Sequence, residues 1–306
     1  PLREDLRTRL GWGHVFHLQP LNDAQRREVL TQHASAILLD PEWGIPASKR
    51  RAKGSGLLMA YEKTGYDANT PGRLPDLLDA WSVRRLKEAG ADCLKILLYY
   101  TPFDPKPVNE FKHAWVERIG DECRANDIPF FLEFVGYEEG ADEKGADYAK
   151  KKPLVVKGAM EEFSKDRYGV DVMKVEIPIN MKFVEGAKCA TPGTTPAYTR
   201  DEAKALFNSV AAVATKPFIY LSAGVSNAEF TESLALAAES GVNYSGVLCG
   251  RATWKDGIAI YGKEGGDAFR KWLETKGVEN INAPAMAIAS LPLIMVPSPW
   301  HPLDCN

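Results

Sequence analysis

Two lysines and one glutamate stand inside apolar runs of the sequence, where ionisable side chains are uncommon. Lys95 lies in the run 93–100, Glu133 in the run 129–137 and Lys174 in the run 171–180. Each run has the length and composition of a buried β-strand, in which successive side chains alternate between two faces. The residues on either side of each charged group are apolar and take the face that packs on helices. The three charged groups therefore point to the opposite face, the interior of a closed sheet.

These residue types together are suited to Schiff-base chemistry. Burial and the nearby positive charge of Lys95 lower the pKa of Lys174 and leave a neutral, nucleophilic amine. Glu133 would then transfer protons. The alternative is an inert network of lysine–glutamate pairs that stabilises the centre of the fold, because buried ion pairs are also common structural devices. A single lysine favours that alternative, whereas three converging ionisable groups favour a catalytic site.

Two later runs end in residues that suit a phosphate group. The run 217–224 ends with Ser222 and Gly224, and the run 244–251 ends with Gly250 and Arg251. Glycine lets backbone N–H groups approach phosphate oxygens, serine adds a hydroxyl, and arginine adds a bidentate donor. Glycine after a strand is more often simple turn chemistry. The occurrence of both motifs at the last two strands, where barrel enzymes frequently bind phosphate, favours a phosphate site.

The order of the apolar runs predicts how these residues are positioned. Amphipathic helical segments at 77–90, 109–126 and 200–215 separate them, which is typical of βα units and a parallel sheet. We therefore predict an α/β fold, a TIM (β/α)8-like barrel over 35–281, with an N-terminal extension or helix at 1–34 and a proline-rich tail at 282–306. The seven strand-like runs are 35–40, 56–62, 93–100, 129–137, 171–180, 217–224 and 244–251.

A closed barrel of this type needs one more strand than these runs supply. The only candidate is the short piece 14–18, which stops close to Pro20. Proline interrupts a strand because it has no N–H to donate to a neighbour. The first strand of the barrel is thus expected to be missing or replaced.

Composition limits the partners of the protein. The chain has 306 residues, a net charge of −3 and a pI near 6.1, so no general basic field attracts nucleic acid or an anionic membrane. The apolar stretch 280–300 contains four prolines, which argues against a membrane span. The five cysteines form no Cys-x-x-Cys pair and indicate reduced thiols in the cytoplasm. A homo-oligomer is compatible with this sequence.

Cofactor chemistry has little support in the sequence. The five histidines lie outside the ends of the central strands, so a histidine-ligated metal is not expected. No P-loop and no dinucleotide-binding glycine fingerprint occurs. We expect an enzyme without a cofactor that acts on a small phosphorylated molecule.

Several runs of the sequence resemble the tagatose-1,6-bisphosphate aldolase family of class I, Schiff-base aldolases. The likeness extends in order from about residue 35 to about residue 281. It implies a cytoplasmic lyase with a barrel fold that cleaves tagatose 1,6-bisphosphate, or a related ketose bisphosphate, to dihydroxyacetone phosphate and glyceraldehyde 3-phosphate. The runs that carry the resemblance are 39–44, 60–66, 95–100, 130–133, 174–180, 221–226 and 246–254.

The resemblance also implies a role for individual residues. Lys174 would form the Schiff base, Glu133 would be the general acid/base, and Lys95 would contact substrate oxygens. The phosphate site would be lined by Ser222, Leu248, Gly250 and Arg251.

Two alternatives stay open at this point. The first keeps the lysine chemistry and changes the substrate, for example to a sulfofructose phosphate. The second is a non-catalytic relative that binds phosphosugars. The reason for this alternative is that family members have an Asp-Gln-Arg-Gly run at the end of their first strand, and this run does not occur in the present chain.

Overall fold

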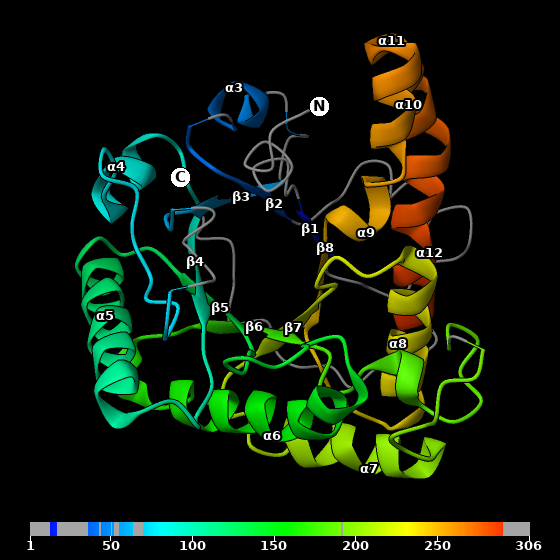
Figure 1. Cartoon of the computed structure of the whole chain (residues 1–306). Coiled ribbons are helices and arrows are strands. Elements are labelled where there is room, and N and C mark those ends of the chain that lie inside the picture. Colours follow the sequence, from blue (N-terminus) through cyan, green and yellow to red (C-terminus); the bar gives the residue numbers. More distant parts are fainter. Residues whose placement is uncertain are drawn as a thin grey trace.

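The strands of the protein form a closed barrel, shown in the computed structural model of Figure 1. The structure describes residues 13–16, 36–42, 44–49, 51, 55–63, 70–190 and 192–289. Most of the predicted extension 1–34 and of the predicted tail 282–306 lies outside these residues. In order around the barrel, the strands are β1 (Gly13–Phe16), β2 (Ala36–Leu39), β3 (Gly56–Ala60), β4 (Cys93–Tyr99), β5 (Phe130–Val135), β6 (Val172–Glu176), β7 (Phe218–Leu221) and β8 (Gly246–Cys249).

The strands β2 to β8 are parallel, and each corresponds to one of the predicted apolar runs. The predicted TIM-like fold is therefore confirmed. Its first strand is replaced by β1, which pairs antiparallel with both β2 and β8. This strand overlaps the candidate piece 14–18. A reversed strand closes the ring because backbone N–H and C=O groups can pair in either direction.

Helices surround the strands in Figure 1. The predicted segment 77–90 is helical only over 83–88, because Leu77 instead forms a β-bridge with Glu62 and the helix begins after the Ser82 cap. Another helix begins at a capping box, in which Thr199 and Glu202 bond each other's backbone N–H groups. The helices are α3 (Ile45–Ser48), α4 (Val83–Glu88), α5 (Lys106–Ala125), α6 (Ala146–Phe163), α7 (Arg200–Ala211), α8 (Asn227–Glu239), α9 (Arg251–Trp254), α10 (Gly257–Glu264), α11 (Gly266–Trp272) and α12 (Val278–Ala289).

Among the described residues, three short turns are of other helix types. They are η1 (Asp166–Tyr168), η2 (Met181–Phe183) and the π-helical η3 (Leu273–Gly277). Helix α12 packs against α8 and continues past residue 281. Within the described part of the chain, no helix has both the length and the apolar character needed to span a membrane.

Two separate apolar cores result from the alternation of strand side chains. The larger core fills the space between the strands and the surrounding helices. The smaller core lies inside the barrel and forms an apolar floor beneath any polar group further along the strands. This floor consists of Leu38, Leu58, Ala60, Val172, Ile219 and Leu248.

The closest approach between α5 and η1 depends on a glycine. A Cβ atom on Gly120 would overlap the backbone carbonyl oxygen of Tyr168. We expect Gly120→Ala to lower the free energy of unfolding by about 1–3 kcal/mol, because the helix must move away from η1. Urea denaturation followed by circular dichroism measures this change.

Gly262, inside α10, is the matched control. No atom lies within 4 Å of the position that its Cβ would take. The Gly262→Ala variant should be as stable as the parent protein or more stable, since alanine favours helix. Equal urea midpoints for the two variants would contradict the steric explanation.

Candidate active site

Four ionisable side chains form a continuous buried row inside the barrel. Glu62 Oε1 lies 2.5 Å from Lys95 Nζ. Lys95 Nζ lies 2.8 Å from Glu133 Oε2, and Glu133 Oε1 lies 2.5 Å from Lys174 Nζ. None of the four side chains is more than 8% exposed. Negative and positive groups alternate along this row, so each charge is compensated by a neighbour.

Strand register explains why these side chains meet. Glu133 and Lys174 are direct partners on β5 and β6. Lys95 is the strand partner of Phe131, which lies two residues before Glu133 on the same face of β5. The long side chain of Lys95 spans this offset and reaches the carboxylate of Glu133. Ala60 is the partner of Lys95 on β3, and Glu62 follows two residues later on the same face. The structure therefore brings together all three residues that we predicted as catalytic.

Glu62 is a member of the row that our sequence reasoning missed. The sequence does indicate its inward orientation, because every second residue of a strand points to the same face. Leu58 and Ala60 point into the barrel, and Glu62 is the next residue in this series. Glu176, two residues after Lys174, is also buried. It accepts a hydrogen bond from the Gly136 backbone N–H at 2.7 Å and forms an ion pair with Lys152 Nζ at 3.2 Å.

The row separates the pKa values of its two lysines. Burial lowers the pKa of Lys174 to about 8, and the positive charge of Lys95 acts in the same direction, against the attraction of Glu133. Burial also acts to lower the pKa of Lys95, but its two carboxylate neighbours outweigh this and raise it above the ordinary value. Lys174 is therefore available as a neutral amine near neutral pH, whereas Lys95 remains a cation.

The pKa values of the two carboxylates in the row, Glu62 and Glu133, also differ. Burial acts to raise the pKa of Glu133, but attraction to Lys174 and Lys95, with their hydrogen bonds, outweighs it and lowers the pKa to about 2. Among the described residues, Lys95 is the cationic partner of Glu62, and burial raises the pKa of Glu62 above the ordinary value. Glu62 is thus the more basic of the two buried carboxylates.

A cavity of about 1050 Å³ opens onto this row. Its volume is large enough for a small phosphorylated sugar. All five residues that we predicted as the phosphate site line the same cavity as Lys174. They are Ser222, Gly224, Leu248, Gly250 and Arg251.

The turn after β7 shapes the part of the cavity where we predicted a phosphate site. Ala223 and Gly224 both have positive φ angles, 47° and 75°. A Cβ atom on Gly224 would lie 3.1 Å from Cζ of Arg251, so glycine permits the close approach of the guanidinium group. Lys255 Nζ donates to the carbonyl oxygen of Gly224 at 3.0 Å. Two cations therefore flank this turn, of which only Arg251 was predicted.

Another cation on the cavity wall was not predictable from periodicity. Arg73 comes from the connection between β3 and α4, pairs with Glu143 at 2.6 Å, and lies over the ring of Tyr137 at 4.4 Å from the centroid. Loop residues have no alternation that indicates their direction. No feature of the sequence around Arg73 distinguishes it from a solvated surface arginine.

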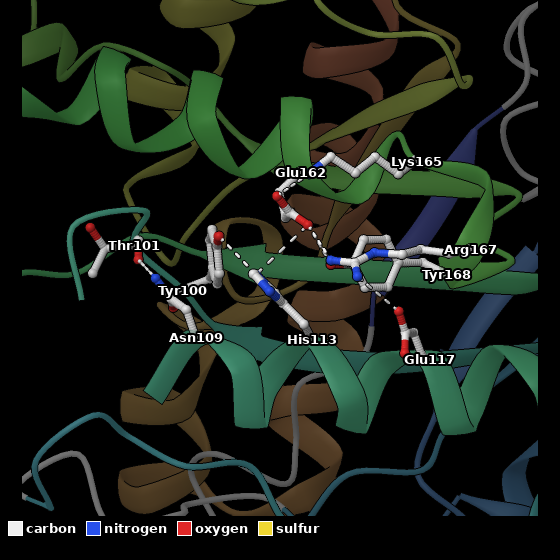
Figure 2. A network of polar contacts seen from close by, with 9 residues as sticks. All are labelled: Tyr100, Thr101, Asn109, His113, Glu117, Glu162, Lys165, Arg167 and Tyr168. Carbon is white, nitrogen blue, oxygen red and sulfur yellow. Dashed lines mark hydrogen bonds and ion pairs between the residues drawn. The ribbon is translucent and has the colours of Figure 1, made fainter. Parts of the chain in front are cut away.

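A second polar network lies outside the barrel, between α5 and α6, beside a cavity of about 600 Å³ (Figure 2). His113 Nε2 lies 3.1 Å from the hydroxyl of Tyr100 and 3.9 Å from Glu162 Oε1. Glu162 accepts hydrogen bonds from Lys165, Arg167 and the Tyr168 hydroxyl. This network joins α6 and η1 to α5 and contains no residue of the buried row.

The pKa of Lys174 leads to a prediction for the free protein. Only a neutral amine reacts with acetic anhydride, so acetylation of Lys174 should increase with pH with a midpoint of about 8. Competitive labelling followed by peptide mass spectrometry measures this midpoint. Lys95 is the matched control in the same cavity and should stay unlabelled through this range. A midpoint for Lys174 at the ordinary lysine value of 10.5 would contradict the pKa assignment.

Comparisons with known proteins agree with this geometry. A sequence model described as the DeoC/LacD family aldolase matches residues 5–256. The tagatose 1,6-diphosphate aldolase of Listeria monocytogenes is 56% identical over 257 residues, which cover 84% of this chain and 75% of that protein. Tagatose 1,6-diphosphate aldolase 2 of Streptococcus pyogenes is 54% identical over 256 residues, covering 83% of this chain and 77% of that protein.

Among solved structures, the fructose-bisphosphate aldolase of Plasmodium falciparum is similar to this chain. The TM-score is 0.57 over 88% of this chain and 83% of that chain, at 15% sequence identity, which supports the fold alone. The family match and the two relatives confirm the resemblance that the sequence motifs indicated. The chain belongs to the DeoC/LacD family of aldolases.

Proposed function

We propose that the protein is a class I aldolase that cleaves tagatose 1,6-bisphosphate, or a related ketose bisphosphate, to dihydroxyacetone phosphate and glyceraldehyde 3-phosphate. The observation that carries this proposal is the buried Lys174 amine, with a pKa of about 8, in contact with Glu133 in a cavity of suitable size. Relatives that are more than half identical and named as tagatose 1,6-diphosphate aldolases support the choice of substrate.

The first half of the reaction takes place at the lysine nitrogen. The neutral amine of Lys174 attacks the C2 carbonyl of the open-chain ketose and forms a carbinolamine. Glu133, 2.5 Å from this nitrogen, is placed to accept and return the protons that accompany loss of water. The product is an iminium ion, which withdraws electrons from the C3–C4 bond.

The phosphate group of the substrate would hold the carbonyl over the nitrogen. Arg251, the Gly250 backbone amide and the Ser222 hydroxyl would bind it, with Lys255 as an additional cation beside the turn. Binding energy from this remote group positions the reacting carbon, which is how an enzyme reduces the entropic part of the barrier. Lys95, held between two carboxylates, would donate to substrate oxygens.

Bond cleavage converts the iminium ion to a neutral enamine. Glu133 then has one cationic neighbour fewer, and its pKa must rise, since attraction to the nitrogen of Lys174 helps to keep it low. The carboxyl group therefore becomes a better proton donor at the stage when the enamine has to be protonated. Hydrolysis of the resulting iminium ion releases dihydroxyacetone phosphate.

The state of the described cysteines supports the predicted cytoplasmic location. The described cysteines, Cys93, Cys123, Cys189 and Cys249, are all free thiols. Free thiols are the usual state of cysteine in a reducing compartment.

Replacement of the nucleophile tests the proposed mechanism. Lys174→Met removes the amine and keeps a side chain of similar length, so cleavage of tagatose 1,6-bisphosphate should fall by at least about 10⁴-fold. A coupled assay for the triose phosphates measures the rate, and circular dichroism checks the fold. A folded variant that still cleaves the substrate would end this assignment.

The identity of the sugar is a separate question. A sulfofructose phosphate would use the same lysine and place its sulfonate where the bisphosphate has its distal phosphate. We expect kcat/KM to be higher for tagatose 1,6-bisphosphate than for sulfofructose 1-phosphate in parallel assays. The reverse order would leave the lysine chemistry intact and favour the sulfonated substrate.

A further inference from the structure

Arg73 is a cation on the cavity wall that the reaction described above does not use. Its side chain is 14% exposed and lines the same cavity as Lys174. Among the described residues, its hydrogen-bond partner is Glu143, whose Oε1 accepts from Nη2 at 2.6 Å. A guanidinium group carries five N–H donors, so this single ion pair leaves it able to bind a further anion.

The backbone around Arg73 forms a tight turn that fixes the direction of this side chain. Arg73 has a positive φ angle of 42°, which is disfavoured for a residue with a Cβ atom, and it follows Gly72 at 79°. The Arg73 N–H donates to the Thr70 carbonyl oxygen at 2.9 Å, and the Gly72 N–H donates to Glu139 Oε1 at 2.9 Å. Such unfavourable backbone conformations occur preferentially at functional sites.

Two tyrosine rings position the guanidinium group. Its Cζ atom lies 4.4 Å from the ring centroid of Tyr137 and 5.1 Å from that of Tyr99. Tyr137 is itself held in place, because its hydroxyl accepts from Lys112 Nζ at 2.8 Å and donates to Asp104. Tyr99 ends β4 and Tyr137 follows β5, so Arg73 lies at the ends of these two strands.

The order of the strands places Arg73 across the cavity from the predicted phosphate site. That site follows β7 and β8, and β8 is four strands away from β4 in the closed ring. Glu133 on β5 and Lys174 on β6 lie between the two positions. The Tyr99 hydroxyl is within electrostatic reach of both sides: burial raises its pKa, and the charges of Arg73 and Arg251 both act against this rise.

The proposed position of the substrate indicates which anion reaches Arg73. With C2 bonded to Lys174, the C1 phosphate is one carbon away and reaches the neighbouring strands β7 and β8. The longer part of the sugar, C3 to C6, then extends past Glu133 toward β4 and ends in the C6 phosphate. We propose that Arg73 binds this C6 phosphate and thereby gives the protein its preference for a ketose bisphosphate over a ketose 1-phosphate. This inference rests on the proposed aldolase function.

Two substrates separate this role from the chemistry at Lys174. Tagatose 1,6-bisphosphate and tagatose 1-phosphate differ only in the C6 phosphate, and both release dihydroxyacetone phosphate, so one coupled assay measures kcat/KM for each. The parent protein should prefer the bisphosphate by at least about 10-fold, because charge-assisted hydrogen bonds to a phosphate are strong. Equal values would overturn the role of Arg73 and leave the aldolase function intact. Cleavage of neither substrate would overturn the aldolase function itself.

Arg73→Gln is the variant that tests the proposal. We expect kcat/KM for the bisphosphate to fall by about 10–10²-fold, while the value for the 1-phosphate stays within about threefold of the parent value. An unchanged preference for the bisphosphate would contradict the proposal. Equal loss on both substrates would contradict it too, since Arg73 would then only maintain the shape of the cavity.

Glu143→Gln separates the cation from its ion pair. This variant removes the same contact between the two loops but keeps the guanidinium group in the cavity. It should retain the preference for the bisphosphate, because the C6 phosphate still finds its cation. The same selective loss as in Arg73→Gln would overturn the proposal, since the contact between the loops would then explain the effect.

Arg167→Gln is the matched control. Arg167 also lies over a tyrosine ring, 4.6 Å from the centroid of Tyr168, and pairs with Glu162 and Glu117, but it belongs to the network outside the barrel (Figure 2). Its loss should leave both kcat/KM values unchanged. A change in substrate preference as large as that of Arg73→Gln would overturn the proposal.

A second substitution keeps the test decisive if Arg73→Gln does not fold. Arg73→Lys retains the charge but lacks the planar pair of donors that matches two phosphate oxygens. It should lower the preference for the bisphosphate by about 3–10-fold, with little change on the 1-phosphate. Equal loss on both substrates in this variant would overturn the proposal.

Discussion

The alternation of charge along the buried row from Glu62 to Lys174 is the interaction on which the rest of the site depends. Taking a single charge out of water costs several kcal/mol, roughly, even after the protein relaxes. In this row each group is within 2.8 Å of an opposite charge, so the barrel can hold all four together. The two carboxylates beside Lys95 keep it charged, and Lys174 has the lower pKa of the two lysines.

The barrel supplies the conditions that this row needs. Parallel register places Glu133 directly beside Lys174, and the apolar floor below them excludes water from one side. The strands end at the cavity, where the glycine turn after β7 allows Arg251 to approach the backbone. Lys174 from one strand and the residues that we propose for phosphate binding at the last two strands thus line a common cavity, as in barrel enzymes that combine chemistry with binding.

Sequence reasoning predicted this site where the alternation of a strand indicates direction. Lys95, Glu133 and Lys174 have apolar neighbours on both sides, so their inward orientation followed from the pattern. Glu62 was missed although it continues the alternation of the predicted run 56–62, because it is the last residue of that run and the polar Lys63 follows it. Arg73 comes from a loop, where no period exists. The reversed direction of β1 was not predictable either, since a strand of four residues pairs in both orientations.

The central claim is that Lys174 forms a covalent bond with the substrate carbonyl. The most direct measurement is intact-mass spectrometry after the protein is mixed with dihydroxyacetone phosphate and sodium borohydride, followed by peptide mapping. The account predicts one adduct per chain, on the peptide that contains Lys174. An adduct on Lys95, or none on a correctly folded protein, would contradict it.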